Sequence, residues 1–188
     1  ILADHGADVI KVEPPAGDEV RDWGPPFHDG DASYFVGINR NKRAMGLDLT
    51  KPAGQEVLFK LLDGADVLFE NFKPGQLEAW GIGYETLSKI NPRLVYASIS
   101  GFGQTGPYAA RPGFDQIAQG MGGLMPVTGL PGHGPLRVGI PIADLCGGIF
   151  AAYGVTVALL EREAASALLS SDPAHSGALD DLIGHSLT

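Results

Sequence analysis

Short apolar stretches alternate along the chain with longer segments whose apolar residues recur at helical spacing. The predicted strands, each ended by glycine, proline or polar residues, are residues 9–13, 44–49, 67–70 and 94–100. The predicted helices are residues 50–64, 74–80, 84–90, 114–121 and 142–162. Because strands that alternate with helices imply βαβ units, the pattern predicts an α/β fold with a mostly parallel sheet covered by helices on both faces.

Polar segments follow several of these strands. Ligands of open parallel sheets bind at the carboxyl ends of the strands, where Asn-Phe at 71–72 and Gly-Phe at 101–102 are expected to lie. The segment 69–75 (Phe-Glu-Asn-Phe-Lys-Pro-Gly) either reads and stacks a base or forms only a turn. Likewise, residues 39–43 (Asn-Arg-Asn-Lys-Arg) either offer three cations to phosphate groups or form a solvated turn. Residues 14–31, rich in glycine, proline and charge, are predicted to be an ordered loop.

One charged residue, Asp144, interrupts a long apolar run between Arg137 and Glu161. A carboxylate in apolar surroundings loses hydration, which favours its neutral form unless hydrogen-bond donors compensate. Asp144 is either the N-cap of a helix that starts near Pro141 or a carboxylate nucleophile at a helix N-terminus, and the two interpretations are compatible. The run 138–160 is long enough to span a membrane, but Asp144 and the glycines around it favour a helix buried in the protein.

The charge balance of the chain argues against nucleic acid as a partner. The formal net charge is -9 and the pI is near 4.8, whereas nucleic acid favours a basic surface. A single cysteine, Cys146, excludes a disulfide within the chain and suits a reducing, cytoplasmic compartment. The five histidines lack metal-ligand spacing, and the chain contains no Gly-x-Ser-x-Gly motif of a serine hydrolase. The sequence therefore predicts no metal site, no nucleic-acid partner and no membrane association.

Seven segments, taken together and in this order, resemble the family III CoA-transferases, the CaiB/BaiF type. They are residues 2–13, 17–27, 39–43, 70–75, 94–106, 111–115 and 139–144. The resemblance implies that residues 1–163 form a segment of the family's large domain, a Rossmann-like and mostly parallel sheet with flanking helices. Residues 164–188 do not match and are expected to be an atypical tail. The missing initiator methionine, and the missing family segments before Ile1 and after Glu163, indicate a fragment cut at both ends.

The resemblance implies an enzyme that transfers CoA from an acyl-CoA donor to a carboxylic acid acceptor. Asp144 is then the nucleophile: its carboxylate attacks the thioester to give a mixed anhydride, and the released CoA thiolate converts this into an aspartyl-CoA thioester. The acceptor carboxylate attacks next, and CoA returns to the new acyl group. Backbone N–H groups at the helix start would stabilise the anionic groups.

The same resemblance assigns residues to the CoA site. They are Asn71, Phe72 and Lys73 along the CoA chain, Gly113, Phe114 and Asp115 at the reacting end, and Leu47, Asp48, Leu49 and Thr50 near the adenine. CoA is a substrate in this chemistry, so no permanently bound cofactor is expected. The family further implies an interlocked homodimer whose small-molecule partners are an acyl-CoA and a carboxylic acid, with dicarboxylic acyl groups expected.

Two alternatives stay open. The 2-methylacyl-CoA racemases share the fold and carry Gly-His-Asp where this chain has Gly113, Phe114 and Asp115. Racemisation needs an acid and a base on opposite faces of the α-carbon, and phenylalanine supplies neither, so transfer is favoured. The other alternative is a remnant that binds CoA without catalysis.

Overall fold

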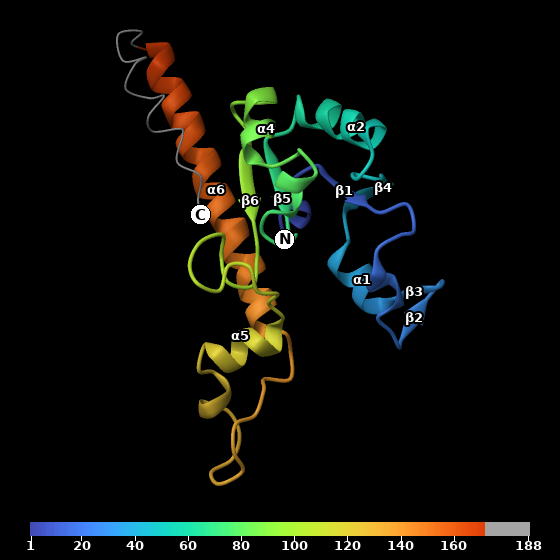
Figure 1. Ribbon diagram of the computed structural model, residues 1–188, viewed down its shortest axis with the longest axis vertical. Coiled ribbons are helices and arrows are strands. Elements are labelled where there is room, and N and C mark those ends of the chain that lie inside the picture. Colours follow the sequence, from blue (N-terminus) through green and yellow to red (C-terminus); the bar gives the residue numbers. More distant parts are fainter. Residues whose placement is uncertain (172–188) are drawn as a thin grey trace. The chain divides into compact units, whose positions relative to one another are not determined.

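The computed structural model describes residues 1–171 and divides into two compact units, Ile1–Leu61 and a second unit that begins at Leu62 (Figure 1). Within the described residues, each unit contains one pair of parallel strands joined by a crossover that holds helices. Parallel strands require such crossovers, so the predicted α/β class is confirmed.

The first unit is built on strands β1 and β4, which pair in parallel from Val9 opposite Lys42 to Glu13 opposite Gly46. In chain order its elements are η1 (Ala3–His5), β1 (Val9–Glu13), η2 (Glu19–Asp22), β2 (Phe27–His28), β3 (Asp31–Ala32), α1 (Ser33–Ile38), β4 (Lys42–Gly46) and α2 (Pro52–Leu62). Strands β2 and β3 form an antiparallel hairpin inside the crossover.

Ion pairs at the end of β1 hold this crossover. Arg21 donates to the buried Glu13 at 2.7 Å and to both carboxylate oxygens of Asp31 at 3.1 Å. Its guanidinium also lies over the Phe35 ring, 4.0 Å from the centroid. Lys11 extends the cluster through a 2.6 Å contact with Asp18. Because every charge in the cluster faces an opposite charge, the buried carboxylate of Glu13 is compensated, and Arg21 first, with Lys11, lowers the pKa of Glu13.

The second unit is built on strands β5 (Val67–Glu70) and β6 (Val95–Ser98), paired in parallel from Val67 opposite Val95 to Glu70 opposite Ser98. Its helices are α3 (Gln76–Ala79), α4 (Tyr84–Ile90), α5 (Asp115–Met121), the short 3-10 turn η3 (Met125–Val127) and α6 (Ile142–Ser171). The buried apolar residues of this unit are Leu62, Leu77, Ile82, Leu87, Leu94, Ala152 and Val155. The core therefore lies between the α3–α4 crossover, strand β6 and one face of α6.

Helix α6 runs antiparallel to the two strands that it accompanies (Figure 1). Near the amino ends of the strands, Arg162 binds Asp66 at 2.7 Å and the carbonyl of Arg93 at 2.9 Å. Near the carboxyl ends, a Cβ placed on Gly147 would meet Ile99 at 4.0 Å. The start of α6, and with it Asp144, is thus held at the carboxyl-end edge of β5 and β6, where ligands of parallel sheets bind.

Most predicted elements are confirmed, some with shifted bounds. Strands β1 and β5 and helix α4 coincide with their predictions, whereas the strand predicted at 44–49 lies at Lys42–Gly46. Pairing with β1 decides that register, and residues 47–51 connect β4 to α2. Helix α1 and the β2–β3 hairpin were not predicted from the sequence.

The prediction that the long apolar helix is buried in the chain is wrong. Only 11% of the most apolar window of Ile142–Ala167 is buried, although its length and composition alone would allow this stretch to cross a membrane. The exposed side chains include Leu145, Ile149, Phe150, Tyr153, Val157 and Leu160. The described residues cover one face of α6 and leave the other open.

The predicted boundary at residue 164 stays a prediction. Helix α6 continues without a break from Glu163 to Ser171. Residues 172–188, the larger part of the predicted tail, lie outside the described residues.

Candidate active site

Two loops meet where β5 and β6 end. The amide of Asn71 donates to the carbonyl of Ile99 at 2.6 Å, and the Glu70 carboxylate accepts from the backbone N–H of Phe72 at 2.6 Å. These bonds fix the loop that carries Asn71, Phe72 and Lys73 against the glycine-rich segment after β6. The sequence prediction that both loops share one edge of the sheet is confirmed.

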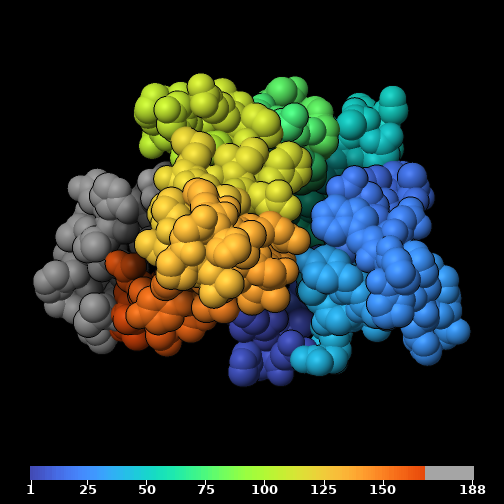
Figure 2. Space-filling view, turned by 90° about the horizontal axis from the view of Figure 1, so that it is seen from below, coloured from blue at the N-terminus to red at the C-terminus, as the bar shows by residue number. Residues whose placement is uncertain are grey.

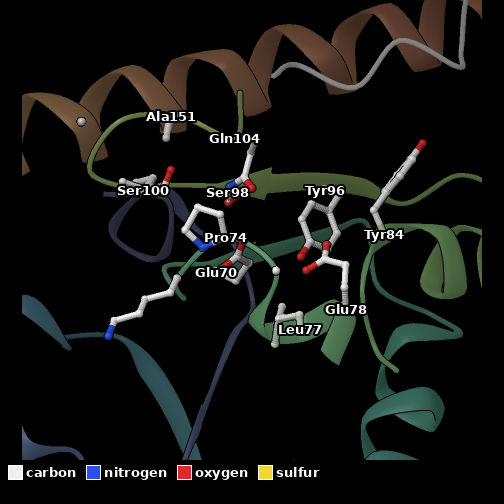
Figure 3. Close-up of a pocket in the computed structure, with 15 residues that line it drawn as sticks. Glu70, Pro74, Leu77, Glu78, Tyr84, Tyr96, Ser98, Ser100, Gln104 and Ala151 are labelled. Carbon is white, nitrogen blue, oxygen red and sulfur yellow. Dashed lines mark hydrogen bonds between the residues drawn. The ribbon is translucent and has the colours of Figure 1, made fainter. Parts of the chain in front are cut away.

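A cavity of about 430 Å³ opens beside these loops (Figure 3). Its lining includes Glu70, Lys73, Pro74, Leu77, Glu78, Tyr84, Tyr96, Ser98, Ser100 and Gln104, with Gly147 and Ala151 contributed by α6. Of the predicted CoA residues, Lys73 lines the cavity and is the one basic residue among its lining residues. Asn71 and Phe72 are exposed next to it, and the Phe72 ring packs edge-on against Trp80 at 5.5 Å.

The two ends of the cavity differ in their polar groups. At one end, Gln104 donates to the Ser98 hydroxyl at 2.5 Å, and the neighbouring Ser100 hydroxyl is buried without a hydrogen-bond partner in the described part of the chain. At the other end, Tyr96 points toward Glu70 and Glu78 (Figure 3). Burial first, and then the negative charges of these two glutamates, raise the pKa of Tyr96. The cavity therefore offers neutral hydroxyl and amide groups together with two carboxylates and one ammonium.

Asp144 lies in the first turn of α6, as its third residue. It is not the N-cap, so the capping interpretation is wrong, because the helix already begins at Ile142. Residues 144, 147 and 151 recur at helical spacing, so Asp144 lies on the face of α6 that borders the cavity, one turn toward the N-terminus.

The environment of Asp144 also differs from the expected apolar one, because the residue is exposed to solvent. Partial desolvation of its carboxyl group, and then the negative charge of Asp115, nevertheless raise the pKa of Asp144. The result is an accessible carboxylate whose basicity exceeds that of an ordinary aspartate.

The predicted residues of the reacting end, 113–115, have three different surroundings. Gly113 packs against Gly101 so closely that a Cβ on Gly101 would lie 2.2 Å from the Gly113 Cα atom. Phe114 is 70% exposed, whereas Asp115 is buried and is hydrogen-bonded within the chain. Phe114 therefore is available to a ligand and Asp115 is not.

The residues predicted near the adenine belong to the first unit and lie in the connection between β4 and α2. Asp48 accepts from the backbone N–H of Thr50 at 3.0 Å and from its hydroxyl at 2.6 Å. Leu47 donates its backbone N–H to Glu13, continuing the β1–β4 pairing, and Leu49 accepts from Gln55.

The cations at 39–43 are engaged inside the first unit. Arg40 binds Asp4 at 3.0 Å, and Arg43 binds Asp8 through two contacts of 3.1 and 2.6 Å. Lys42 donates to Asn39, and burial first, then the charge of Lys11, lowers the pKa of Lys42. The turn interpretation of this segment agrees with these contacts.

Sequence reasoning missed several residues of the site. Glu78 lay in no motif, Tyr96 and Ser98 lay in the family segment 94–106 without being assigned to the site, and Gln119 was visible only as the residue one helical turn after Asp115. Residues 101–106 do have the G-x-G-x-x-G spacing of a dinucleotide-binding loop, but the structure continues them as bends and turns rather than as a helix. Because that fingerprint needs a helix N-terminus for the pyrophosphate, the loop does not form such a site.

Among residues 1–171 no group of three or more His, Cys, Asp or Glu side chains has a metal-binding arrangement.

Comparison with known proteins agrees with this architecture. The model of CoA-transferase family III matches residues 1–167. Succinyl-CoA–D-citramalate CoA-transferase of Chloroflexus aurantiacus is 46% identical over 164 residues, which is 87% of this chain and 41% of that protein. Acetyl-CoA:oxalate CoA-transferase of Acetobacter aceti is 49% identical over 166 residues, 87% of this chain and 42% of that protein. The crystal structure of a CaiB/BaiF family protein from Brucella suis superimposes with a TM-score of 0.83 at 48% identity, covering 86% of this chain and 44% of that one.

The chain therefore belongs to CoA-transferase family III. It spans about two fifths of the length of the curated relatives that it matches.

Proposed function

We propose that the protein transfers CoA from an acyl-CoA to a carboxylic acid and that Asp144 is its nucleophile. The observation that carries the proposal is the position of Asp144: an accessible carboxylate of raised pKa, in the first turn of a helix, at the carboxyl-end edge of β5 and β6. The curated relatives support it, since they are named as CoA-transferases.

The chemistry consists of four acyl exchanges that balance without a net proton. A carboxylate oxygen of Asp144 attacks the thioester carbon, the CoA thiolate leaves, and a mixed anhydride forms. The thiolate then attacks the aspartyl carbon, releases the donor acid as a carboxylate, and leaves an aspartyl-CoA thioester. The acceptor carboxylate displaces CoA from this thioester, and the thiolate attacks the acceptor side of the new anhydride, which regenerates Asp144. The positive, N-terminal end of the α6 dipole would stabilise the anionic intermediates.

The cavity beside Asp144 fits the pantetheine part of CoA better than its phosphates. The two glutamates in its lining repel phosphate, whereas the Ser100 hydroxyl, the Ser98 hydroxyl and Gln104 suit amide groups. Lys73 is the lining residue that would approach a phosphate. For the acyl group we infer a short dicarboxylate, since relatives are named for succinate, citramalate, glutarate and oxalate.

We further propose a cytoplasmic homodimer without membrane association. The single, unpaired Cys146 supports a reducing compartment. The exposed apolar side chains of α6 support coverage by more protein.

Mass spectrometry of the intact protein tests the role of Asp144. Incubation with succinyl-CoA or another short acyl-CoA should produce a covalent CoA adduct that hydroxylamine removes, and peptide mapping should locate it at Asp144. The Asp144→Ala variant should form no adduct and lose turnover by about three orders of magnitude or more. The exposed Asp63 offers a matched control, and Asp63→Ala should behave like the wild type.

An adduct that persists in Asp144→Ala would refute the proposal, and so would the absence of an adduct with every acyl-CoA of a broad panel. Proton exchange at the substrate α-carbon without acyl exchange would indicate a racemase instead.

A further inference from the structure

Two buried polar side chains on α5 bind each other and face the start of α6. Asp115 begins the helix and Gln119 follows one turn later, with 8% and 2% of their surfaces exposed. The amide Nε2 of Gln119 donates to the Oδ2 atom of Asp115 at 2.6 Å. Buried polar groups persist only where they are hydrogen-bonded, so the remaining bonds of this pair show what it holds.

The remaining bonds all reach the segment that leads into Asp144. The Oδ1 atom of Asp115 accepts the backbone N–H of Ala143 at 2.8 Å. The Oε1 atom of Gln119 accepts the backbone N–H of Val138 at 2.8 Å, and its Nε2 atom contacts the Ile140 carbonyl at 3.4 Å. The pair therefore holds three backbone groups within the six residues immediately before Asp144. In Figure 2, the yellow residues of α5 and the orange segment ahead of α6 form one continuous surface.

The bond to Ala143 is a helix cap supplied by another helix. The first N–H groups of a helix have no partner within it, and a negative charge at this end is favoured by the helix dipole. The residues just ahead of α6 include Gly139 and Pro141, whose side chains cannot accept a hydrogen bond. Asp115 takes over this role across the chain, and it does so at the residue that precedes Asp144.

We propose that Asp115 and Gln119 are positioning residues. They hold the backbone of the first turn of α6 in place and thereby orient the carboxylate of Asp144 toward the site. This inference rests on the proposed function of Asp144, and it replaces the expectation that Asp115 borders the CoA site as a ligand. Asp115 is buried and each of its carboxylate oxygens accepts a bond inside the chain, so the group is turned away from a substrate.

The charge of Asp115 has a second effect on its neighbour. It contributes, after desolvation, to the raised pKa of Asp144. A more basic carboxylate is a better nucleophile once it is ionised, so the same group that orients Asp144 also strengthens it.

Steady-state kinetics of the intact protein separates positioning from binding. Asp115→Asn keeps the size of the side chain but removes its charge and one acceptor, and we expect kcat to fall about tenfold or more while KM for the acyl-CoA changes by less than about twofold. The acid limb of the pH–rate profile should also move to lower pH, because Asp144 loses its negative neighbour.

Gln119→Met removes the bonds to Asp115 and Val138 at similar side-chain volume. It should lower kcat in the same way, with a smaller effect on the pH profile. Gln116 on the same helix is exposed, and Gln116→Met should leave both constants unchanged.

The values of kcat and KM, the pH profile and the melting temperature decide the outcome. Rates are expressed per folded molecule, measured by circular dichroism, so that loss of fold is not counted as loss of kcat. A raised KM at unchanged kcat would overturn the proposal in favour of a ligand role for Asp115. Wild-type kcat and pH profile, with only the melting temperature reduced, would overturn it in favour of a purely structural role. Formation of the Asp144 adduct by the wild-type protein is scored separately, so failure of the positioning role is distinguishable from failure of the transferase proposal.

Discussion

At the scale of single residues, the site depends on how a carboxylate can be both accessible and reactive. Asp144 is exposed, yet partial desolvation and the charge of Asp115 raise its pKa. The two properties are compatible because Asp115 acts from the buried side, through the helix start, while the opposite side of Asp144 remains open to a substrate. A fully buried aspartate would be more basic but out of reach of a thioester.

The raised pKa of Asp144 predicts the pH dependence of the first half-reaction. Attack requires the ionised carboxylate, so the rate of adduct formation falls as the pH drops through the raised pKa of Asp144. The acid limb should therefore lie above the value of about 4 of an ordinary aspartate. Rapid-quench measurement with acyl-CoA alone avoids titration of the acceptor acid. A limb at or below the ordinary aspartate value would contradict the prediction.

The contact between Gly101 and Gly113 predicts a strong effect of one methyl group. In Gly101→Ala, the new Cβ atom would lie 2.2 Å from the Gly113 Cα, a backbone atom that cannot move aside alone. We expect a loss of about 3 kcal/mol of unfolding free energy, at the upper end of overpacking, and lower activity because the loop after β6 separates from the start of α5.

Gly64→Ala is the matched control for Gly101→Ala, because nothing lies within 4 Å of its added Cβ. Urea denaturation should give it a midpoint near that of the wild type. Equal midpoints for the two variants would show that the close approach of Gly101 and Gly113 does not limit stability.

At the scale of elements, the sequence pattern predicted the bounds of those strands and helices whose structure depends on local interactions. Strands β1 and β5 and helix α4 have clear periodicity and sharp ends, and their predicted bounds hold. Strand β4 begins two residues earlier than predicted because its partner β1 sets the register. Helix α1 has only six residues, and it is stabilised by Phe35 under Arg21 and by the ion pairs around it, which no periodicity reveals.

The site shows the same division. The order of strands and helices sufficed to predict that Asn71 and the loop after β6 meet at one edge, since this follows from parallel pairing. The Asp115–Gln119 pair was missed because its partners, Val138 and Ala143, follow a loop whose path is not encoded by spacing. An aspartate and a glutamine one turn apart on a helix remain the only local sign of it.

At the scale of the whole chain, α6 carries two faces with different roles. One face packs on β6 and buries Ala152 and Val155, whereas Phe150, Tyr153 and Leu160 are about 70% exposed on the other, at 71%, 69% and 66%. An exposed apolar patch of this kind favours association with further protein.

The 188-residue chain alone should therefore self-associate. The double variant Phe150→Ser, Leu160→Gln should shift the chain toward the monomer, as measured by light scattering at equal concentration. Replacing the polar, exposed Glu161 by Gln provides the control on the same helix and should leave association unchanged. A wild-type chain that stays monomeric and does not bind a hydrophobic dye would show that the open face needs no cover, and the homodimer proposal would then lose its structural support.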